Sequence, residues 1–262
     1  MKKKLIIFDM DGTLYLGDDL FDGVRDLFNF LKEKKINYVF FTNNSSHDLD
    51  FYYQKMRRFD IPCTLEDNFY SSSEVTISYL LKKKVKTIFP LCNESLLKKL
   101  KEHFDIVTEY RKDVKVDAVV AGFYTELIYQ RLRDGCLYLE NQNPLFIATN
   151  GDYRCPIENM NFIPDCGGMI EWMRLTSGKK AKVMGKPNPE VINYFLDKYH
   201  LKKEDILVVG DRLYTDIQVG INADVDTLCV LSGEASLDDV KRYPHQPTYI
   251  KESVVSLIDM LK

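Results

Sequence analysis

The chain has 262 residues, the length of one large domain or two modest ones. It carries 36 Lys and Arg residues against 39 Asp and Glu residues, a net charge of −3 that argues against a general nucleic-acid binder. No apolar run approaches the roughly 18 residues of a membrane span, and the first run ends at Asp9, too early for a signal peptide. Six scattered cysteines without a CxxC pair fit a reducing compartment, so we expect a cytoplasmic protein that binds neither nucleic acid nor membrane.

Short apolar strands alternate with amphipathic helices in the first part of the chain. Residues 4–8 and 36–41 are rich in β-branched and aromatic side chains and are predicted strands. Residues 47–59 are a predicted helix. Another helix lies between the two strands, where apolar residues follow the helical spacing: Val24, Leu27, Phe28 and Leu31.

The same alternation continues to the end of the chain. The middle has three predicted strands and one predicted helix, at residues 87–91, 118–121, 145–148 and 127–139, although Gly135 weakens the helix. Near the end, strands are predicted at 206–209 and 227–231, with a helix at 216–223 between them. Continuous apolar strands alternating with helices predict an α/β fold with a Rossmann-like parallel sheet, whose ligands bind at the carboxyl ends of the strands.

Acidic residues follow two of these strands directly. Asp9 and Asp11 come after the first strand, with Gly12 allowing an unusual turn, and Asp211 follows the strand at 206–209. Two like charges so close need a cation or a raised pKa to coexist, and carboxylates suit a hard cation such as Mg²⁺. Taken alone, each motif also fits a polar turn or a helix cap.

Two further motifs have side chains suited to phosphate. Thr42, Asn43 and Asn44 follow the second strand with hydroxyl and amide groups, although a plain helix cap is the favoured explanation when they are taken alone. Lys186 lies between Gly185 and Pro187, in a loop that a second proline also restrains before the next helix. A lone lysine is usually a solvated surface charge, but this loop would hold Lys186 near a site.

The four motifs together resemble the haloacid dehalogenase superfamily of phosphohydrolases. The order is an acid pair, a hydroxyl and amide group, a lysine and an acid, and it spans the chain from Asp9 to Asp216. The resemblance implies that Asp9 is the nucleophile, forming an aspartyl-phosphate, and that Asp11 is the general acid and base. Dehalogenases of the superfamily lack an acid at the position of Asp11, so this residue points to a phosphate ester whose leaving group needs a proton.

The resemblance also implies roles for the remaining motif residues. Mg²⁺ would be held by the Asp9 carboxylate, the Asp11 backbone carbonyl and Asp211. Thr42, Lys186 and the Asn43 backbone N–H would hold the phosphoryl oxygens. A supporting role falls to three residues: Asp216, Gly12 and Asn44.

Motif spacing locates an inserted domain. About 30 residues separate the first two motifs, which one helix and one strand use up, whereas about 140 residues separate Thr42 from Lys186. We therefore expect a catalytic core at residues 1–79 and 181–262 and a smaller α/β cap at 80–180. An insertion at this place resembles the NagD-like or 4-nitrophenylphosphatase subfamily, whose cap selects the substrate and whose members often dimerise, so a homodimer is expected by analogy.

The chain departs from that subfamily at two places. Phe21-Asp22-Gly23 stands where the subfamily has a Pro-Gly pair, and residues 164–168 stand where its cap has a glycine-rich stretch. The substrate is predicted to be a small phosphorylated metabolite of the sugar phosphate, phosphoglycolate or nucleotide type. Loops around 150–154 and 166–168 of the cap are predicted to contact it, with three candidate residues: Asn150, Asp152 and Arg154.

Two alternative functions remain open. One is a phosphotransferase of the same superfamily, which passes the phosphoryl group to a second alcohol. The other is a non-catalytic, metabolite-binding regulator that keeps the fold. The intact set of Asp9, Asp11, Lys186 and Asp211 favours the Mg²⁺-dependent phosphatase.

Overall fold

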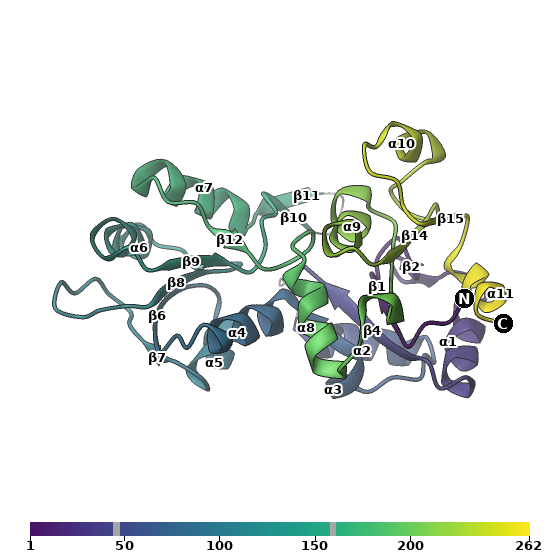
Figure 1. Cartoon of the computed structure of the whole chain (residues 1–262). Coiled ribbons are helices and arrows are strands. Elements are labelled where there is room, and N and C mark those ends of the chain that lie inside the picture. Colours follow the sequence, from purple (N-terminus) through teal and green to yellow (C-terminus); the bar gives the residue numbers. More distant parts are fainter. Residues whose placement is uncertain (44–47, 158–160) are drawn as a thin grey trace. The chain divides into compact units, whose positions relative to one another are not determined.

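A computed structural model describes residues 1–43, 48–157 and 161–262, and the chain forms two compact units. The first unit contains Met1–Thr42, residues 48–71 and Lys186–Lys262. The second contains Ser72–Gly185 together with Asn43, so it is inserted in the sequence of the first. Figure 1 shows both units, which are described separately below.

The first unit is built on a six-stranded sheet in which every pairing is parallel. β1 lies at its centre, with β13 on one side and β4 on the other. The strands of this sheet consist mostly of buried apolar residues, as expected where helices cover both faces. In spatial order they are β15 (Tyr249–Lys251), β14 (Asp226–Val230), β13 (Ile206–Gly210), β1 (Leu5–Phe8), β4 (Asn37–Thr42) and β5 (Phe69–Ser71).

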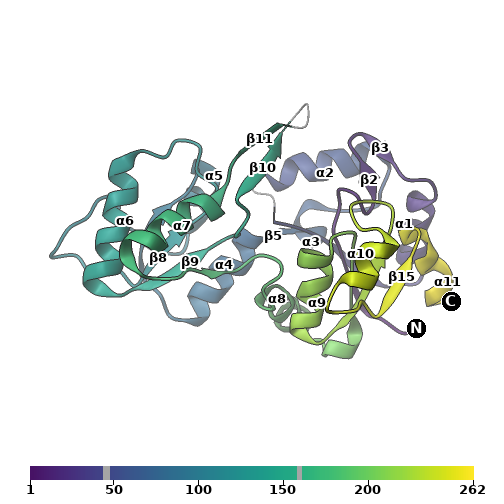
Figure 2. The ribbon, with the colours of Figure 1, turned by 90° about the horizontal axis from the view of Figure 1, so that it is seen from above.

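Helices pack on both faces of this sheet (Figure 2). On one face Phe28 of α1 lies edge-on against Phe8, in a core that α2 and α11 complete. On the other face Phe195 of α8 contacts Phe41 of β4. The helical segments are α1 (Val24–Glu33), α2 (Leu49–Arg58), α3 (Leu65–Asn68), α8 (Glu190–Tyr199), α9 (Gln218–Ala223), α10 (Leu237–Arg242) and α11 (Leu257–Leu261), with short turns η2 (Lys203–Asp205), η3 (Leu213–Ile217) and η4 (Val254–Ser256).

The second unit has its own five-stranded parallel sheet. Helices α6 and α7 pack on one face, around Tyr138 and Met173. The strands and helices of this unit are β12 (Lys182–Val183), β9 (Leu145–Ala148), β8 (Ala118–Ala121), β6 (Thr87–Leu91) and β7 (Asp105–Ile106), with α4 (Ser72–Lys82), α5 (Glu94–Lys101), α6 (Tyr129–Gln142) and α7 (Cys166–Ser177).

Helix α4 belongs to the second unit, which therefore begins several residues before the expected position of 80. Glu74 of α4 pairs with Lys99 of α5, and Lys182 lies over the ring of Tyr79 at 4.3 Å. The unit ends at Gly185, a few residues beyond the expected position of 180. These contacts join α4 to α5 and to β12 of the second unit, which the spacing of motifs cannot reveal.

Two antiparallel hairpins complete the fold. β2 (Tyr15–Leu16) pairs with β3 (Asp19–Leu20) in the first unit, just after Asp11. β10 (Arg154–Ile157) pairs with β11 (Asn161–Pro164) in the second unit. Within the described ranges, no helix is long and apolar enough to cross a membrane.

Candidate active site

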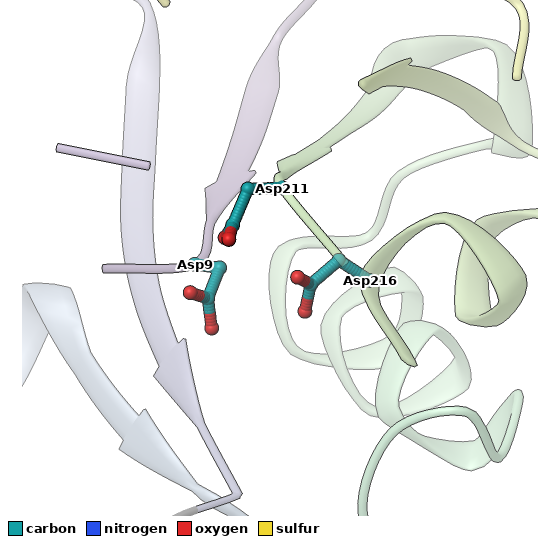
Figure 3. Close-up of side chains that lie close together, drawn as sticks. All are labelled: Asp9, Asp211 and Asp216. Carbon is teal, nitrogen blue, oxygen red and sulfur yellow. The ribbon is translucent and has the colours of Figure 1, made fainter. Parts of the chain in front are cut away.

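Three aspartates bring their carboxylates together in the first unit. Asp9 follows β1, Asp211 follows the neighbouring strand β13, and Asp216 lies in η3. One oxygen from each lies within 4.8 Å of the others, and Figure 3 shows the three groups close together. Asp211 and Asp216 are only 2% and 1% exposed, so water does little to screen their repulsion.

Lys186 places a cation against this cluster. Its Nζ lies 2.6 Å from Oδ1 of Asp9 and 2.7 Å from Oδ1 of Asp216, and it also donates a hydrogen bond to the Phe41 carbonyl. Burial opposes the charge, but Asp216 and Asp9 outweigh it and raise the pKa of Lys186. The ammonium therefore stays charged at every physiological pH.

Asp211 is held in one orientation by groups from two loops. The hydroxyl of Thr13 donates to its Oδ1 at 2.9 Å, and the backbone N–H of Glu234 donates to its Oδ2 at 2.8 Å. Burial, followed by the charge of Asp9, raises the pKa of Asp211, while both donors oppose this shift. Burial and Asp9 likewise raise the pKa of Asp216, against the pull of Lys186.

Two glycines leave room for the Asp211 carboxylate. Gly12 has φ +83°, and a Cβ there would lie 2.4 Å from Oδ2 of Asp211. A Cβ on Gly233 would lie 2.1 Å from the same oxygen and 2.7 Å from the Gly12 carbonyl oxygen. Ser232 donates from its hydroxyl to that carbonyl at 2.9 Å. The expected supporting residue Gly12 thus has a steric reason to be glycine.

The loop Ser232–Glu234 is a part of the site that the sequence analysis missed. It contributes the N–H of Glu234 and the bare Cα of Gly233 to the surroundings of Asp211. Its place in the sequence is the signal that could have indicated it. The loop directly follows β14, and β14 is the neighbour of β13 in the same parallel sheet, so both strands end at the same edge.

Asp11 lies apart from the three-carboxylate cluster that the described residues form. Its side chain is open to solvent and accepts a hydrogen bond from the backbone N–H of Gly17. Partial desolvation, together with the charge of Asp9, raises the pKa of Asp11. A carboxyl group that keeps its proton to higher pH is suited to donate that proton.

The second motif is only partly described. Thr42 is the last residue of β4 and is buried, in register with Ser71 of β5. Asn43 is half-buried and belongs to the second unit, where a Cβ on Gly185 would lie 2.5 Å from its Oδ1. Asn44, predicted to support the site, lies outside the described residues.

The candidate substrate residues of the second unit differ in exposure. Asn150 is completely buried, and its side chain contacts the Asn43 carbonyl, the Asp165 carboxylate and the Asp152 N–H, so it holds a turn together. Asp152 is half-buried. Arg154 is exposed, with its guanidinium 4.3 Å from the ring centre of Phe162. Of these three residues, Arg154 is the one that is exposed.

Residues 166–168 form no loop, contrary to expectation, because they are the first turn of α7. Asp165 caps this helix by accepting a hydrogen bond from the Cys166 N–H. Gly167 packs against backbone, and a Cβ there would lie 2.4 Å from the Gly151 carbonyl oxygen. The other place where the chain departs from the subfamily is Phe21-Asp22-Gly23, which keeps the glycine of the Pro-Gly pair. Gly23 is the N-cap of α1 with φ +79°, a conformation that favours glycine.

Sequence comparison places the chain among phosphatases. A haloacid dehalogenase-like hydrolase model matches residues 6–104, and a HAD-hydrolase-like model matches residues 183–257. The acid sugar phosphatase of Staphylococcus haemolyticus is 31% identical over 258 residues, covering 98% of this chain and 96% of the relative. Phosphoglycolate phosphatase 2 of Arabidopsis thaliana is 30% identical over 278 residues, covering 98% and 92%.

Solved structures agree with this placement. The 4-nitrophenylphosphatase of Thermotoga maritima has a TM-score of 0.88 at 34% identity, covering 99% of this chain and 98% of that one. NagD from E. coli K-12 has a TM-score of 0.87 at 28% identity, covering 97% and 98%. The parallel α/β core, its inserted unit and these whole-chain similarities lead to one conclusion: the chain belongs to the haloacid dehalogenase-like hydrolases and is a phosphatase of the NagD and 4-nitrophenylphosphatase type.

Proposed function

We propose that this phosphatase hydrolyses a small phosphomonoester through an aspartyl-phosphate on Asp9, with Mg²⁺ as its cofactor. The observation that carries the proposal is the Lys186 ammonium, which touches both Asp9 and Asp216 beside the carboxylate of Asp211. Such a group of fixed charges can bind a phosphate dianion against a carboxylate nucleophile, which in water would repel each other.

The first step is attack by a carboxylate oxygen of Asp9 on phosphorus. The bond between phosphorus and the ester oxygen breaks, and Asp11 gives its proton to the departing alcohol. In the second step Asp11, now a carboxylate, takes a proton from water, whose oxygen attacks phosphorus and releases Asp9. The raised pKa of Asp11 supports the first of these roles, because the proton is held closer to neutral pH.

The donor set fits a divalent cation. Hard cations prefer carboxylate oxygens, and here three carboxylates crowd together, with the charges of Lys186 and Arg212 beside them. Following the family resemblance, Asp9 and Asp211, with the backbone carbonyl of Asp11, are the proposed ligands, and Asp216 is left with a supporting role. Bound Mg²⁺ would neutralise part of the negative charge of the nucleophile and the phosphate.

Phosphate oxygens are proposed to be held by Thr42, the Asn43 N–H and Lys186. Thr42 ends β4, the strand beside β1, so its hydroxyl group is placed at the same sheet edge as Asp9. Lys186 contacts Asp9 directly, which supports a role for its charge in binding the phosphoryl group that Asp9 is proposed to attack. Asp216 has the supporting role of fixing the Lys186 side chain.

The second unit is proposed to be the cap that selects the leaving group, and Arg154 its candidate contact for an anionic substrate. Relatives are named acid sugar phosphatase, phosphoglycolate phosphatase and 4-nitrophenylphosphatase. Sugar phosphates, phosphoglycolate and nucleotides are therefore the classes to test. A cytoplasmic homodimer is the assembly that the sequence resemblance suggests.

The test is phosphate release from 4-nitrophenyl phosphate and from a panel of these metabolites, with Mg²⁺ and then with EDTA. We expect release that needs Mg²⁺ and that ranks the substrates by leaving group. Equal release in EDTA would contradict the metal requirement. Transfer to an added alcohol in place of water would indicate a phosphotransferase, and binding without turnover would indicate a regulator.

A further inference from the structure

Lys55 is a nearly buried lysine on α2, close to the loop that carries Asp11. Its residue is 9% exposed, and its Nζ lies 4.1 Å from the ring centre of Tyr15, which is itself buried. A carboxylate oxygen of Asp18 is 3.7 Å from the same Nζ, but the Asp18 side chain is 88% exposed. Water screens such a pair, so it offsets little of the cost of burying the ammonium.

The partners of Lys55 belong to the hairpin that holds Asp11. Tyr15 begins this hairpin, and its carbonyl accepts a hydrogen bond from the N–H of Gly12, the residue after Asp11. Gly17, in the turn of the hairpin, donates its N–H to the Asp11 carboxylate. The hairpin therefore contacts both the backbone next to Asp11 and the Asp11 side chain. Helix α2 in turn contacts the hairpin through Lys55.

The charge of Lys55 also reaches Asp11. Both Lys55 and Arg212 lower the pKa of Asp11, and Lys55 lowers it more. A methionine of similar length would fill the same space beside Tyr15 without the cost of a buried charge. The presence of a cation here thus points to a task at Asp11 and not to stability alone.

We infer that Lys55 is a positioning residue for the general acid: through its contact with Tyr15, to which the screened Asp18 pair adds little, it fixes the β2–β3 hairpin, and the hairpin holds Asp11 where it can reach the leaving-group oxygen. The inference rests on the proposed function. It adds a residue from α2, outside the four motifs, to the protonation step. Neither Lys55 nor the hairpin touches substrate in this role.

The test compares two substrates that differ in their need for a proton. An alkyl phosphate has a poor leaving group and depends on the general acid, whereas 2,4-dinitrophenyl phosphate leaves without protonation. For Lys55→Met we expect kcat/KM to fall about tenfold for the alkyl phosphate, part of the 10²–10⁴ that a general acid supplies. For the dinitrophenyl ester we expect less than about a twofold fall. Its kcat/KM reports only the steps up to formation of the phosphoryl-enzyme, and in those steps this leaving group needs no proton.

Three further variants complete the experiment. Lys55→Arg keeps the charge and is expected to restore alkyl phosphate activity to within about threefold. Asp18→Asn, at an exposed position, should cause a smaller fall with the same substrate preference. Lys83→Met is the matched control, because Lys83 lies over the Tyr79 ring of the second unit and should leave both substrates unchanged.

Each result has a defined meaning. An equal loss for both substrates in Lys55→Met, or no loss for either, overturns the positioning role. If Lys55→Met does not fold, Asp18→Asn and Lys55→Arg decide the matter by the same substrate ratio. Failure of the unsubstituted protein to release phosphate from either ester would reject the proposed function itself and is a separate outcome.

Discussion

Lys186 is a structural counter-ion as well as the proposed active-site cation. Its ammonium is the charge that offsets Asp9 and Asp216, and all three groups are buried or nearly so. Removing one partner of a buried ion pair leaves an uncompensated charge, which commonly costs about 3–5 kcal/mol. If Lys186 has the proposed catalytic role, one side chain serves both activity and stability.

We expect Lys186→Met to lower the free energy of unfolding by about 3 kcal/mol, because two buried carboxylates lose their cation. Urea denaturation without metal measures the change. The double variant Lys186→Met/Asp216→Asn should recover part of this loss, because it removes one of the stranded charges. Equal stability of the single variant and the original protein would contradict this account of the pair.

Asp9→Asn tests the covalent step. An amide cannot replace the attacking carboxylate, so turnover should fall by at least about 10³-fold. The amide has nearly the shape of the carboxylate, and the thermal midpoint should confirm that the fold survives. Rapid-quench trapping with labelled substrate should detect a phosphoryl-enzyme in the original protein and none in the variant. Surviving turnover would rule out Asp9 as the nucleophile.

At the scale of elements, short glycine-containing loops set how closely carboxylates and backbone can approach. Gly233→Ala would force a Cβ to within 2.1 Å of the Asp211 carboxylate and 2.7 Å of a carbonyl oxygen, so the loop must shift. We expect lower activity and a loss of about 1–3 kcal/mol of stability. Gly168→Ala is the matched comparison, because nothing lies within 4 Å of its Cβ position in α7.

Gly168→Ala should stabilise the second unit by up to about 1 kcal/mol, the difference in helix propensity between the two residues. Thermal unfolding and phosphate release on both alanine variants measure the contrast. If the two variants behave alike, steric crowding at Asp211 is not the reason for Gly233.

The regular elements of this protein could be predicted because their local patterns agree with their packing. Three predicted strands of the second unit have the observed limits, and the four apolar residues predicted for α1 are its buried ones. Gly135 weakened the prediction of α6, but the structure explains it by contact: a Cβ there would lie 2.8 Å from Leu91 and 2.9 Å from Met173. Propensity alone cannot show such a close approach.

The site was only partly predictable. Motif order anticipated the meeting of Asp9, Lys186 and Asp211, because parallel strands end at one edge of the sheet. Sequence spacing could not reveal the contact of the Ser232–Glu234 loop with Asp211 or the contact of Lys55 with Tyr15, since both contacts form only in the folded unit. Asn150 was predicted to be a substrate contact, yet its burial comes from packing that no local pattern encodes.

At the scale of the whole molecule, we expect the acidic cluster to make stability depend on pH and on the proposed metal. Burial and the charge of Asp9 raise the pKa values of Asp11 and Asp211, so the native state binds more protons than the unfolded state. Stability without metal should then fall as pH rises above about 4, the ordinary pKa of a carboxyl group in the unfolded chain. In a chain of this length, each 1 kcal/mol lost lowers the thermal midpoint by about 2–4 °C, so the fall is measurable by melting.

Mg²⁺ should remove most of this pH dependence, because a bound cation offsets the repulsion that raises the pKa values. Melting curves at several pH values, with EDTA and with Mg²⁺, measure the effect. Asp211→Asn should flatten the metal-free profile even without added cation. A thermal midpoint that rises with pH in EDTA would contradict the expected fall in stability.

The position of β1 between β4 and β13 has a consequence for synthesis on the ribosome. One of its neighbours follows within the first fifty residues, but the other, Ile206–Gly210, emerges only after the whole inserted unit. The strands of the inserted unit all lie within Ser72–Gly185, so that unit can complete its sheet first. Until Ile206–Gly210 arrives, one edge of β1 is left without its native partner, and the nascent chain is most exposed to misassembly during that interval.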